Sequence, residues 1–299
     1  MVNALEELNA LFGLGDTARF TAGEGGLTRL EVKTPAASGE VYLHGAQVTS
    51  WRPAGQDEVL FVSRQSRWEA GKAIRGGIPV CFPWFRNKTD DSKAPAHGFA
   101  RTHAWQVASV VAEDDGVTAS LTLESDESSL LWWLHAFRAT LRVHFGAQLK
   151  VALSVVNMGK APFSFEEALH TYHRVGDATR MRVSGLDGVT YLDNVRDNLR
   201  KTQEGDVIFH GPTDNAYLET HSALTLHDPG LDRTLLVDKR GSRTTVVWNP
   251  WESGAKAMGD LGDEEWREMA CLEASNILSG AVTLEAGQSH TMETSISIL

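Results

Sequence analysis

The chain shows a short alternation of apolar and polar residues, interrupted every few positions by Gly, Pro, Asn or Asp. In 149–156, apolar side chains stand at every second position, beginning with Leu149 and Val151. A period of two is that of a β-strand with one face on a core. Comparable runs occur at 27–32, 41–44, 48–51, 59–62, 105–111, 117–123, 137–145, 163–175, 181–183, 207–209, 223–226, 234–238, 244–248, 269–273, 281–285 and 291–298. So many short strand-like runs, with turn residues between them, predict an all-β fold, a large antiparallel β-sandwich of two sheets.

The N-terminus has a different period. Leu5, Leu8, Leu11 and Phe12 recur at helical spacing, which predicts a short amphipathic helix within 4–14. We expect it to be a packing cap on the sandwich. No shift in composition, low-complexity linker or internal repeat divides the rest, so the sequence predicts one domain over residues 1–299, with the helical cap at 1–20.

Composition narrows the class of protein. The 299 residues are 42% hydrophobic and carry a net charge of -11, and this acidic balance argues against nucleic acid as a partner. Cys81 and Cys271 lie far apart in apolar runs, which predicts buried thiols in a reducing compartment. The N-terminus lacks the basic start of a signal peptide, and no apolar stretch has the length of a membrane span. We expect a cytoplasmic monomer without a membrane partner.

Residues 74–101 predict a long structured loop over a sheet. Its three prolines fix φ and remove backbone donors, which argues against a helix or a central strand. Arg75 precedes a Gly-Gly pair, whose backbone can adopt conformations closed to other residues. Arg75, His97 and Arg101 suit an anionic, hydroxyl-rich ligand, because an arginine fork matches phosphate or carboxylate oxygens. The alternative is that the two arginines hold loop carbonyls in place.

The segment 163–175 contains an H-x-x-H pattern. If it is a strand, His170 shares a polar face with Tyr172, while His173 lies on the apolar face. The two histidines should then not converge on one metal, and no cysteine cluster completes a ligand set, so we predict no zinc site. His170 can serve as an acid or base near neutral pH, and the alternative is a solvated or structural histidine.

Two carboxylates stand out. Glu273 shares a strand face with Met269 and Cys271, so it is either a strand end in solvent or a functional group with a raised pKa. Asp214 lies between Pro212 and Asn215, which predict a turn, and there it either hydrogen-bonds to the turn backbone or contacts a ligand.

Six segments, taken in order, resemble the hexose-6-phosphate mutarotases, also called glucose-6-phosphate 1-epimerases, which are related to the aldose 1-epimerases. The segments are IRGGIPVCFPWF (74–85), HGFAR (97–101), ALHTY (168–172), TDNAY (213–217), VVWNPW (246–251) and CLEA (271–274). The resemblance implies a galactose mutarotase-like sandwich with an open cleft on one sheet. It also implies interconversion of the α and β anomers of a hexose 6-phosphate, first of all glucose 6-phosphate, without metal or organic cofactor.

The resemblance also assigns roles to individual residues. It makes His170 the general acid and Glu273 the general base of ring opening and reclosure. Substrate-binding positions fall on Arg75, Arg101, Asp214 and His97, of which the two arginines are candidates for the phosphate and Asp214 for a hydroxyl.

Two positions depart from the family pattern. Ala96 stands where some relatives have Gln, and His173 stands where an aromatic residue is expected, which leaves substrate preference open. Three other functions stay open as well: a general aldose 1-epimerase, a non-catalytic sugar-phosphate-binding module, and a glycoside hydrolase. The hydrolase would need two convergent carboxylates, and only Glu273 is a clear candidate.

Overall fold

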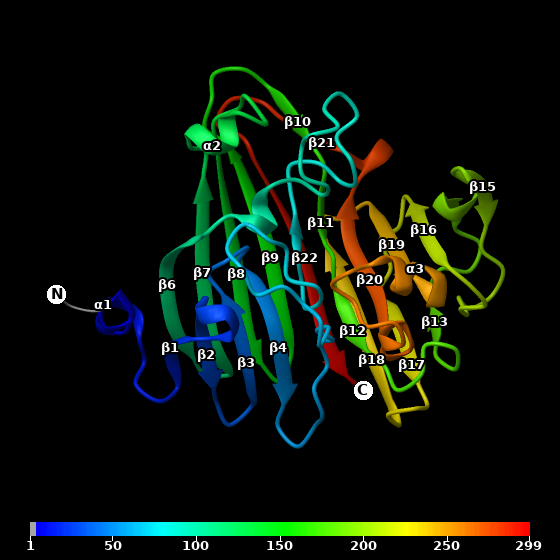
Figure 1. The fold of residues 1–299 in the computed structure, drawn as a ribbon, viewed down its shortest axis with the longest axis horizontal. Helices are drawn as coiled ribbons and strands as arrows, with labels where there is room; N and C mark the ends of the chain where they lie inside the picture. The colour runs from blue at the N-terminus through cyan, green and yellow to red at the C-terminus, as the bar shows by residue number, and fades with distance from the viewer. Residues whose placement is uncertain (1–3) are drawn as a thin grey trace.

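A computed structural model describes residues 4–299 of the chain. The predicted N-terminal helix is confirmed as α1 (Ala4–Phe12), although residues 1–3 of the expected cap lie outside the described residues. Asn9 ties α1 to the first strand, β1 (Ala18–Ala22), because its amide donates to the carbonyl of Phe20 at 2.8 Å and accepts from the Phe20 N–H at 2.8 Å. α1 therefore sits at one end of the sandwich, beside β1 and β6 (Figure 1). The other α-helices are α2 (Glu127–Leu130) and α3 (Trp251–Ala257).

One layer of the sandwich is an eight-stranded antiparallel sheet, called the long sheet here. Its strands, in spatial order, are β13 (Arg182–Ser184), β17 (Leu224–Asp228), β18 (Arg233–Arg240), β22 (Ser289–Ile298), β9 (Leu149–Asn157), β8 (Phe137–Gly146), β7 (Gly116–Glu124) and β6 (Gln106–Glu113).

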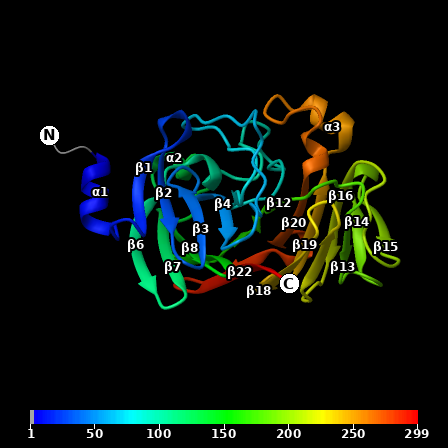
Figure 2. The same ribbon diagram turned by 90° about the horizontal axis from the view of Figure 1, so that it is seen from below.

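The opposite layer consists of two sheets. The four-stranded sheet contains β1, β2 (Thr28–Lys33), β3 (Ala37–Tyr42) and β4 (Gln47–Pro53). The second eight-stranded sheet, called the short sheet, has the order β15 (Leu199–Thr202), β14 (Thr190–Asp193), β16 (Thr213–Leu218), β19 (Thr244–Asn249), β20 (Met269–Asn276), β11 (Glu167–Leu169) and β5 (Val80–Cys81), with β12 (Tyr172–Arg174) also paired to β20. Figure 2 shows both sheets on one side of the long sheet, at its two ends. A small ladder joins β10 (Phe163–Phe165) to β21 (Val282–Leu284).

The hydrophobic core lies between these layers. The alternating residues of β9 confirm the predicted period, because Leu149, Val151, Leu153 and Val155 are all fully buried. Aromatic side chains such as Trp51 fill the space between the sheets. The predicted antiparallel β-sandwich is thus confirmed. No helix among residues 4–299 is long and apolar enough to cross a membrane.

The predicted segmentation is wrong in several places. Residues 59–62 and 207–209 form only isolated bridges, and 163–175 divides into three short strands. The turn expected around Asp214 is instead strand β16, which pairs with β14 on one side and β19 on the other. Pairing on both edges supplies the backbone partners that a local turn would otherwise supply, so tertiary context overrides the turn residues. The two short strands β14 and β15 had no clear sequence signal.

Candidate active site

The candidate site is built on β20, whose two faces have different surroundings. Leu272 and Ala274 point into the sandwich core, whereas Cys271 packs in a separate apolar cluster on the opposite face. Glu273 shares the face of Cys271, since side chains alternate along a strand. It lies in the middle of the strand and is only 1% exposed. Of the two alternatives for Glu273, the solvent-exposed strand end is therefore wrong, because the carboxylate is buried.

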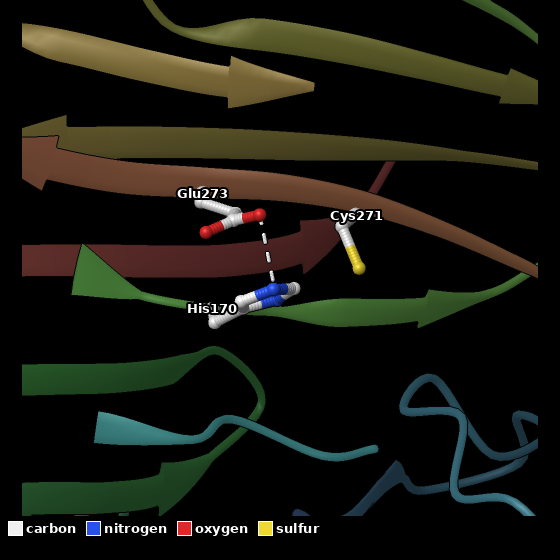
Figure 3. Close-up of side chains that lie close together, drawn as sticks. All are labelled: His170, Cys271 and Glu273. Carbon is white, nitrogen blue, oxygen red and sulfur yellow. Dashed lines mark ion pairs between the residues drawn. The ribbon is translucent and has the colours of Figure 1, made fainter. Parts of the chain in front are cut away.

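The strand register brings His170 next to Glu273. Leu169 pairs with Ala274 and Tyr172 pairs with Cys271 across the same ladder. Continuing this register places His170 opposite Glu273, and the His170 Nδ1 and Glu273 Oε1 atoms are 3.4 Å apart (Figure 3). Two residues that are more than a hundred positions apart thus form a pair because their strands are neighbours.

His173 lies on the other side of this strand. It pairs with Ala270, a residue of the sandwich core, and is fully buried. The prediction that the H-x-x-H pattern does not converge on one metal is consistent with this geometry. The aromatic residue expected at this position by resemblance would also lie behind the site, not in it.

Burial disfavours the charged forms of both members of the pair. Neither carboxylate oxygen of Glu273 nor the Nδ1 of His170 has a hydrogen-bond partner among residues 4–299. Burial, with the negative charge of Asp214 as a smaller cause, raises the pKa of Glu273 well above its ordinary value. Burial, with the positive charges of Arg101 and Arg75 as smaller causes, lowers the pKa of His170 to about 3. Both shifts favour the form of the pair in which Glu273 is protonated and His170 is neutral.

The loop 74–101 reaches the site by a close backbone approach. Gly77 has a φ of 63°, and a Cβ there would collide with the carbonyl oxygen of Val48. Gly76 has a φ of 120° and would collide with the backbone at Phe61. The expectation that the Gly-Gly pair adopts a backbone closed to other residues is confirmed. This backbone presents Arg75 to the same face of the short sheet as Glu273.

The two predicted arginines have different partners. Arg75 forms two bonds with the carboxylate of Asp260, at 3.2 and 3.1 Å, and donates to the Tyr172 hydroxyl at 3.0 Å. Arg101 donates Nη2 to the carbonyl of Ala96 at 2.8 Å, as the structural alternative expected. It forms no ion pair within the described part of the chain, and burial lowers the pKa of its guanidinium. Arg101 is therefore the cation of this region whose charge is not balanced by a carboxylate.

The negative charge of Asp214 is balanced by Arg86, an arginine that the sequence analysis did not select. Arg86 Nη2 lies 2.7 Å from Asp214 Oδ1, and Asn194 donates to the backbone carbonyl of Asp214 at 2.9 Å. Burial raises the pKa of Asp214, and the charge of Arg86 opposes that rise. Arg86 also connects to His97, because the Arg86 backbone N–H donates to His97 Nδ1 at 3.3 Å. Burial, followed by the charge of Arg101, keeps the pKa of His97 well below its ordinary value.

The structure brings all six predicted site residues into one pocket of about 380 Å³. They are Arg75, His97, Arg101, His170, Asp214 and Glu273. The side chain of Trp248 forms part of the wall, and its ring meets that of His170 edge to face at 5.7 Å. Ala96 also lines the pocket, so the position that departs from the family pattern lies where it can affect a ligand. This arrangement places a buried histidine–glutamate pair, an aromatic wall and three guanidinium groups around one small cavity.

Comparison with known proteins agrees with this geometry. The model of the aldose 1-epimerase family matches residues 28–297, which is most of the chain. The chain belongs to the aldose 1-epimerase family. It is therefore an epimerase that interconverts sugar anomers.

Several relatives share this epimerase's sequence or fold. A protein of Cenchrus ciliaris named "Putative glucose-6-phosphate 1-epimerase" is 37% identical over 259 residues, covering 83% of this chain and 78% of the relative. A protein of Escherichia coli with the same name is 34% identical over 250 residues, covering 83% of each chain. The crystal structure titled as a putative mutarotase (YeaD) from Salmonella typhimurium superposes with a TM-score of 0.90 at 29% identity, over 96% of this chain and 95% of the other.

Sequence reasoning missed several residues of the epimerase pocket. They are Phe85, Arg86, Asn87, Val246 and Met258. Arg86 had a visible signal, since it is a cation inside the selected loop. Its partner Asp214 lies far along the chain, however, and nothing local to either residue indicates the ion pair.

Proposed function

We propose that this epimerase interconverts the α and β anomers of a hexose 6-phosphate, with glucose 6-phosphate as the first candidate. The observation that carries this proposal is the unbalanced guanidinium of Arg101 in the same pocket as the buried His170–Glu273 pair. A half-buried cation without a carboxylate partner favours an anionic ligand. The names of the relatives from Cenchrus ciliaris and Escherichia coli agree with a phosphorylated sugar.

The proposed reaction is a pair of proton transfers by side chains of this chain alone. Glu273 takes the proton of the anomeric hydroxyl, the bond from the anomeric carbon to the ring oxygen breaks, and the O–H electrons form the carbonyl. The ring oxygen takes its electron pair and receives a proton from His170. Rotation of the aldehyde and closure on its other face then give the other anomer. On closure Glu273 returns its proton and His170 regains one, so no external acid, base or cofactor is consumed.

The single proton of the resting pair suits this mechanism. A protonated Glu273 with a neutral His170 contains the same number of protons as a carboxylate with an imidazolium. The active form is therefore reached by moving one proton between atoms 3.4 Å apart. The charges of Arg101 and Arg75 oppose the imidazolium, since both lower the pKa of His170. A substrate phosphate bound to these arginines would offset their charge, so binding itself would favour the active form.

Anomer exchange tests the proposal. Fresh α-glucose 6-phosphate and fresh α-glucose are followed by NMR or polarimetry, with and without the protein, because mutarotation is spontaneous. We expect acceleration of the phosphate ester well above that of the free sugar. Equal acceleration of both would contradict the phosphate preference and indicate a general aldose 1-epimerase. Binding without any acceleration would contradict the acid–base roles and favour a non-catalytic binding module.

The pH profile of kcat/KM tests the protonation states of His170 and Glu273. The one-proton form persists from the low pKa of His170, about 3, up to the raised pKa of Glu273. We therefore expect kcat/KM to stay level from neutral pH down to about pH 5. It should fall at alkaline pH, when Glu273 loses its proton and none remains for His170 to donate. The spontaneous rate is subtracted at each pH, and free glucose serves as a substrate whose own charge does not change. A steady rise in kcat/KM toward alkaline pH would contradict His170 as the proton donor.

Other expectations remain proposals. The buried free thiols Cys81 and Cys271 suit a reducing, cytoplasmic setting, and the acidic net charge argues against nucleic acid. The proposed enzyme acts as a monomer on a small sugar phosphate, without metal or organic cofactor. A glycoside hydrolase is less well supported, because the second pocket carboxylate, Asp214, is held by Arg86.

A further inference from the structure

Cys271 lies next to the proposed acid–base pair but has no role in the proposed reaction. It is a free, fully buried thiol on the same face of β20 as Glu273, two residues earlier. One ligand atom each from His170, Cys271 and Glu273 lie within 4.8 Å of one another. Figure 3 shows the sulfur of Cys271 and the carboxylate of Glu273 extending from one strand beside the imidazole of His170. Three side chains of different donor type thus meet where His170 and Glu273 line the pocket, with the Cys271 thiol buried beside them.

Imidazole nitrogen, thiolate sulfur and carboxylate oxygen are the protein ligands that Zn²⁺ prefers. Tetrahedral bonds of the usual lengths would separate pairs of these atoms by roughly 3.3–3.7 Å, so the most distant pair must approach by about 1 Å. The donor atoms are available, because within residues 4–299 no group donates a hydrogen bond to either Glu273 oxygen, and His170 Nδ1 has no hydrogen-bond partner, only the Glu273 Oε1 atom at 3.4 Å. A buried carboxylate with both oxygens unpartnered is costly, and a cation bound there would offset that cost.

We propose that His170, Cys271 and Glu273 bind Zn²⁺ and that the bound ion inhibits the epimerase. Binding displaces the thiol proton and the proton shared by His170 and Glu273. The ion then occupies both groups that move protons in the proposed reaction, and a water molecule completes the coordination toward the pocket. Among residues 4–299 a second three-residue cluster, Glu113, Asp115 and His144, has exposed carboxylates and no sulfur, so it does not offer the same ligand set.

The test compares two buried thiols. Cys271→Ala removes one ligand, and Cys81→Ala is the matched control, because Cys81 is also a fully buried thiol on a strand of the short sheet but is not in the cluster. Zn²⁺ is titrated into each protein while anomer exchange is measured, with Mg²⁺ as the control ion. We expect wild type and Cys81→Ala to be inhibited alike. We expect Cys271→Ala to keep its basal activity and to need at least about 10-fold more zinc for the same inhibition.

A second measurement detects binding without turnover. Co²⁺ is added in place of Zn²⁺, and a thiolate-to-cobalt charge-transfer absorption is expected in wild type and Cys81→Ala but not in Cys271→Ala. Equal zinc inhibition of Cys271→Ala and wild type, or no thiolate–cobalt absorption in wild type, would overturn the inference. The inhibition rests on the proposed roles of His170 and Glu273, but the cobalt spectrum does not. A thiolate–cobalt band in a protein that does not accelerate anomer exchange would uphold the metal site and refute the proposed reaction.

Discussion

Replacing Glu273 by glutamine is expected to reduce kcat/KM for anomer exchange by about 10²–10⁴-fold, while the protein becomes more stable to heat. The activity falls because glutamine cannot accept the proton of the anomeric hydroxyl. The stability rises because the folded state holds this carboxyl with a raised pKa, so ionised Glu273 is disfavoured by burial. For a carboxyl of this kind, the free energy of unfolding falls as the pH rises from the ordinary glutamate value toward the raised one. Glutamine has no charge, so the variant's free energy of unfolding does not fall in this way at neutral pH.

Both effects can be measured on one preparation. Anomer exchange gives kcat/KM, and thermal unfolding at pH 5 and pH 8 should show the larger gain in Tm at the higher pH. Glu293→Gln is the control, because it makes the same chemical change on β22, away from the pocket. His170→Asn should lose a comparable part of the activity, since it removes the proton donor. Wild-type rates in Glu273→Gln or His170→Asn would rule out the acid–base assignment.

Replacing Arg101 by alanine should weaken catalysis on phosphorylated sugars much more than on free sugars. A charge-assisted contact to a phosphate in a buried pocket contributes about 2–4 kcal/mol, so kcat/KM for glucose 6-phosphate should fall by roughly 30–1,000-fold. For glucose, which has no phosphate, the change should be within a few-fold. Arg101 is expected to matter more than Arg75, because Asp260 already holds the Arg75 guanidinium by two bonds.

Arg75→Ala, compared with Arg101→Ala, separates loss of phosphate binding from loss of stability. Arg75→Ala should also reduce activity on glucose 6-phosphate, but it leaves Asp260 and Tyr172 without their partner and should lower Tm. Arg64→Ala serves as a control, because Arg64 is exposed and pairs with Glu268 away from the pocket. Equal losses of activity on both sugars in Arg101→Ala would remove the phosphate-binding role.

The fold class was readable from the sequence because side-chain period is a local property. The alternation in β9 appears in the residue order itself, and burial of one face follows from it. The same local rule placed His170 with Tyr172 and His173 on the opposite face, which the pairing with Cys271 and Ala270 agrees with. The strained backbone at Gly76 and Gly77 was also expected, since glycine tolerates positive φ. Resemblance to a family then selected the six residues that line one pocket.

Tertiary structure decided which of these groups are close to each other. The residues around Glu273 were also compatible with a solvent-exposed strand end, and its burial follows from its place in the middle of a sheet. The residues of β16 predict a turn, but pairing with strands on both sides holds them in a strand. The ion pair of Arg86 with Asp214, and the unbalanced charge of Arg101, depend on contacts between distant parts of the chain. Periodicity shows the face on which a residue lies, but strand order and register determine its neighbour across the sheet, and that neighbour sets its charge and pKa.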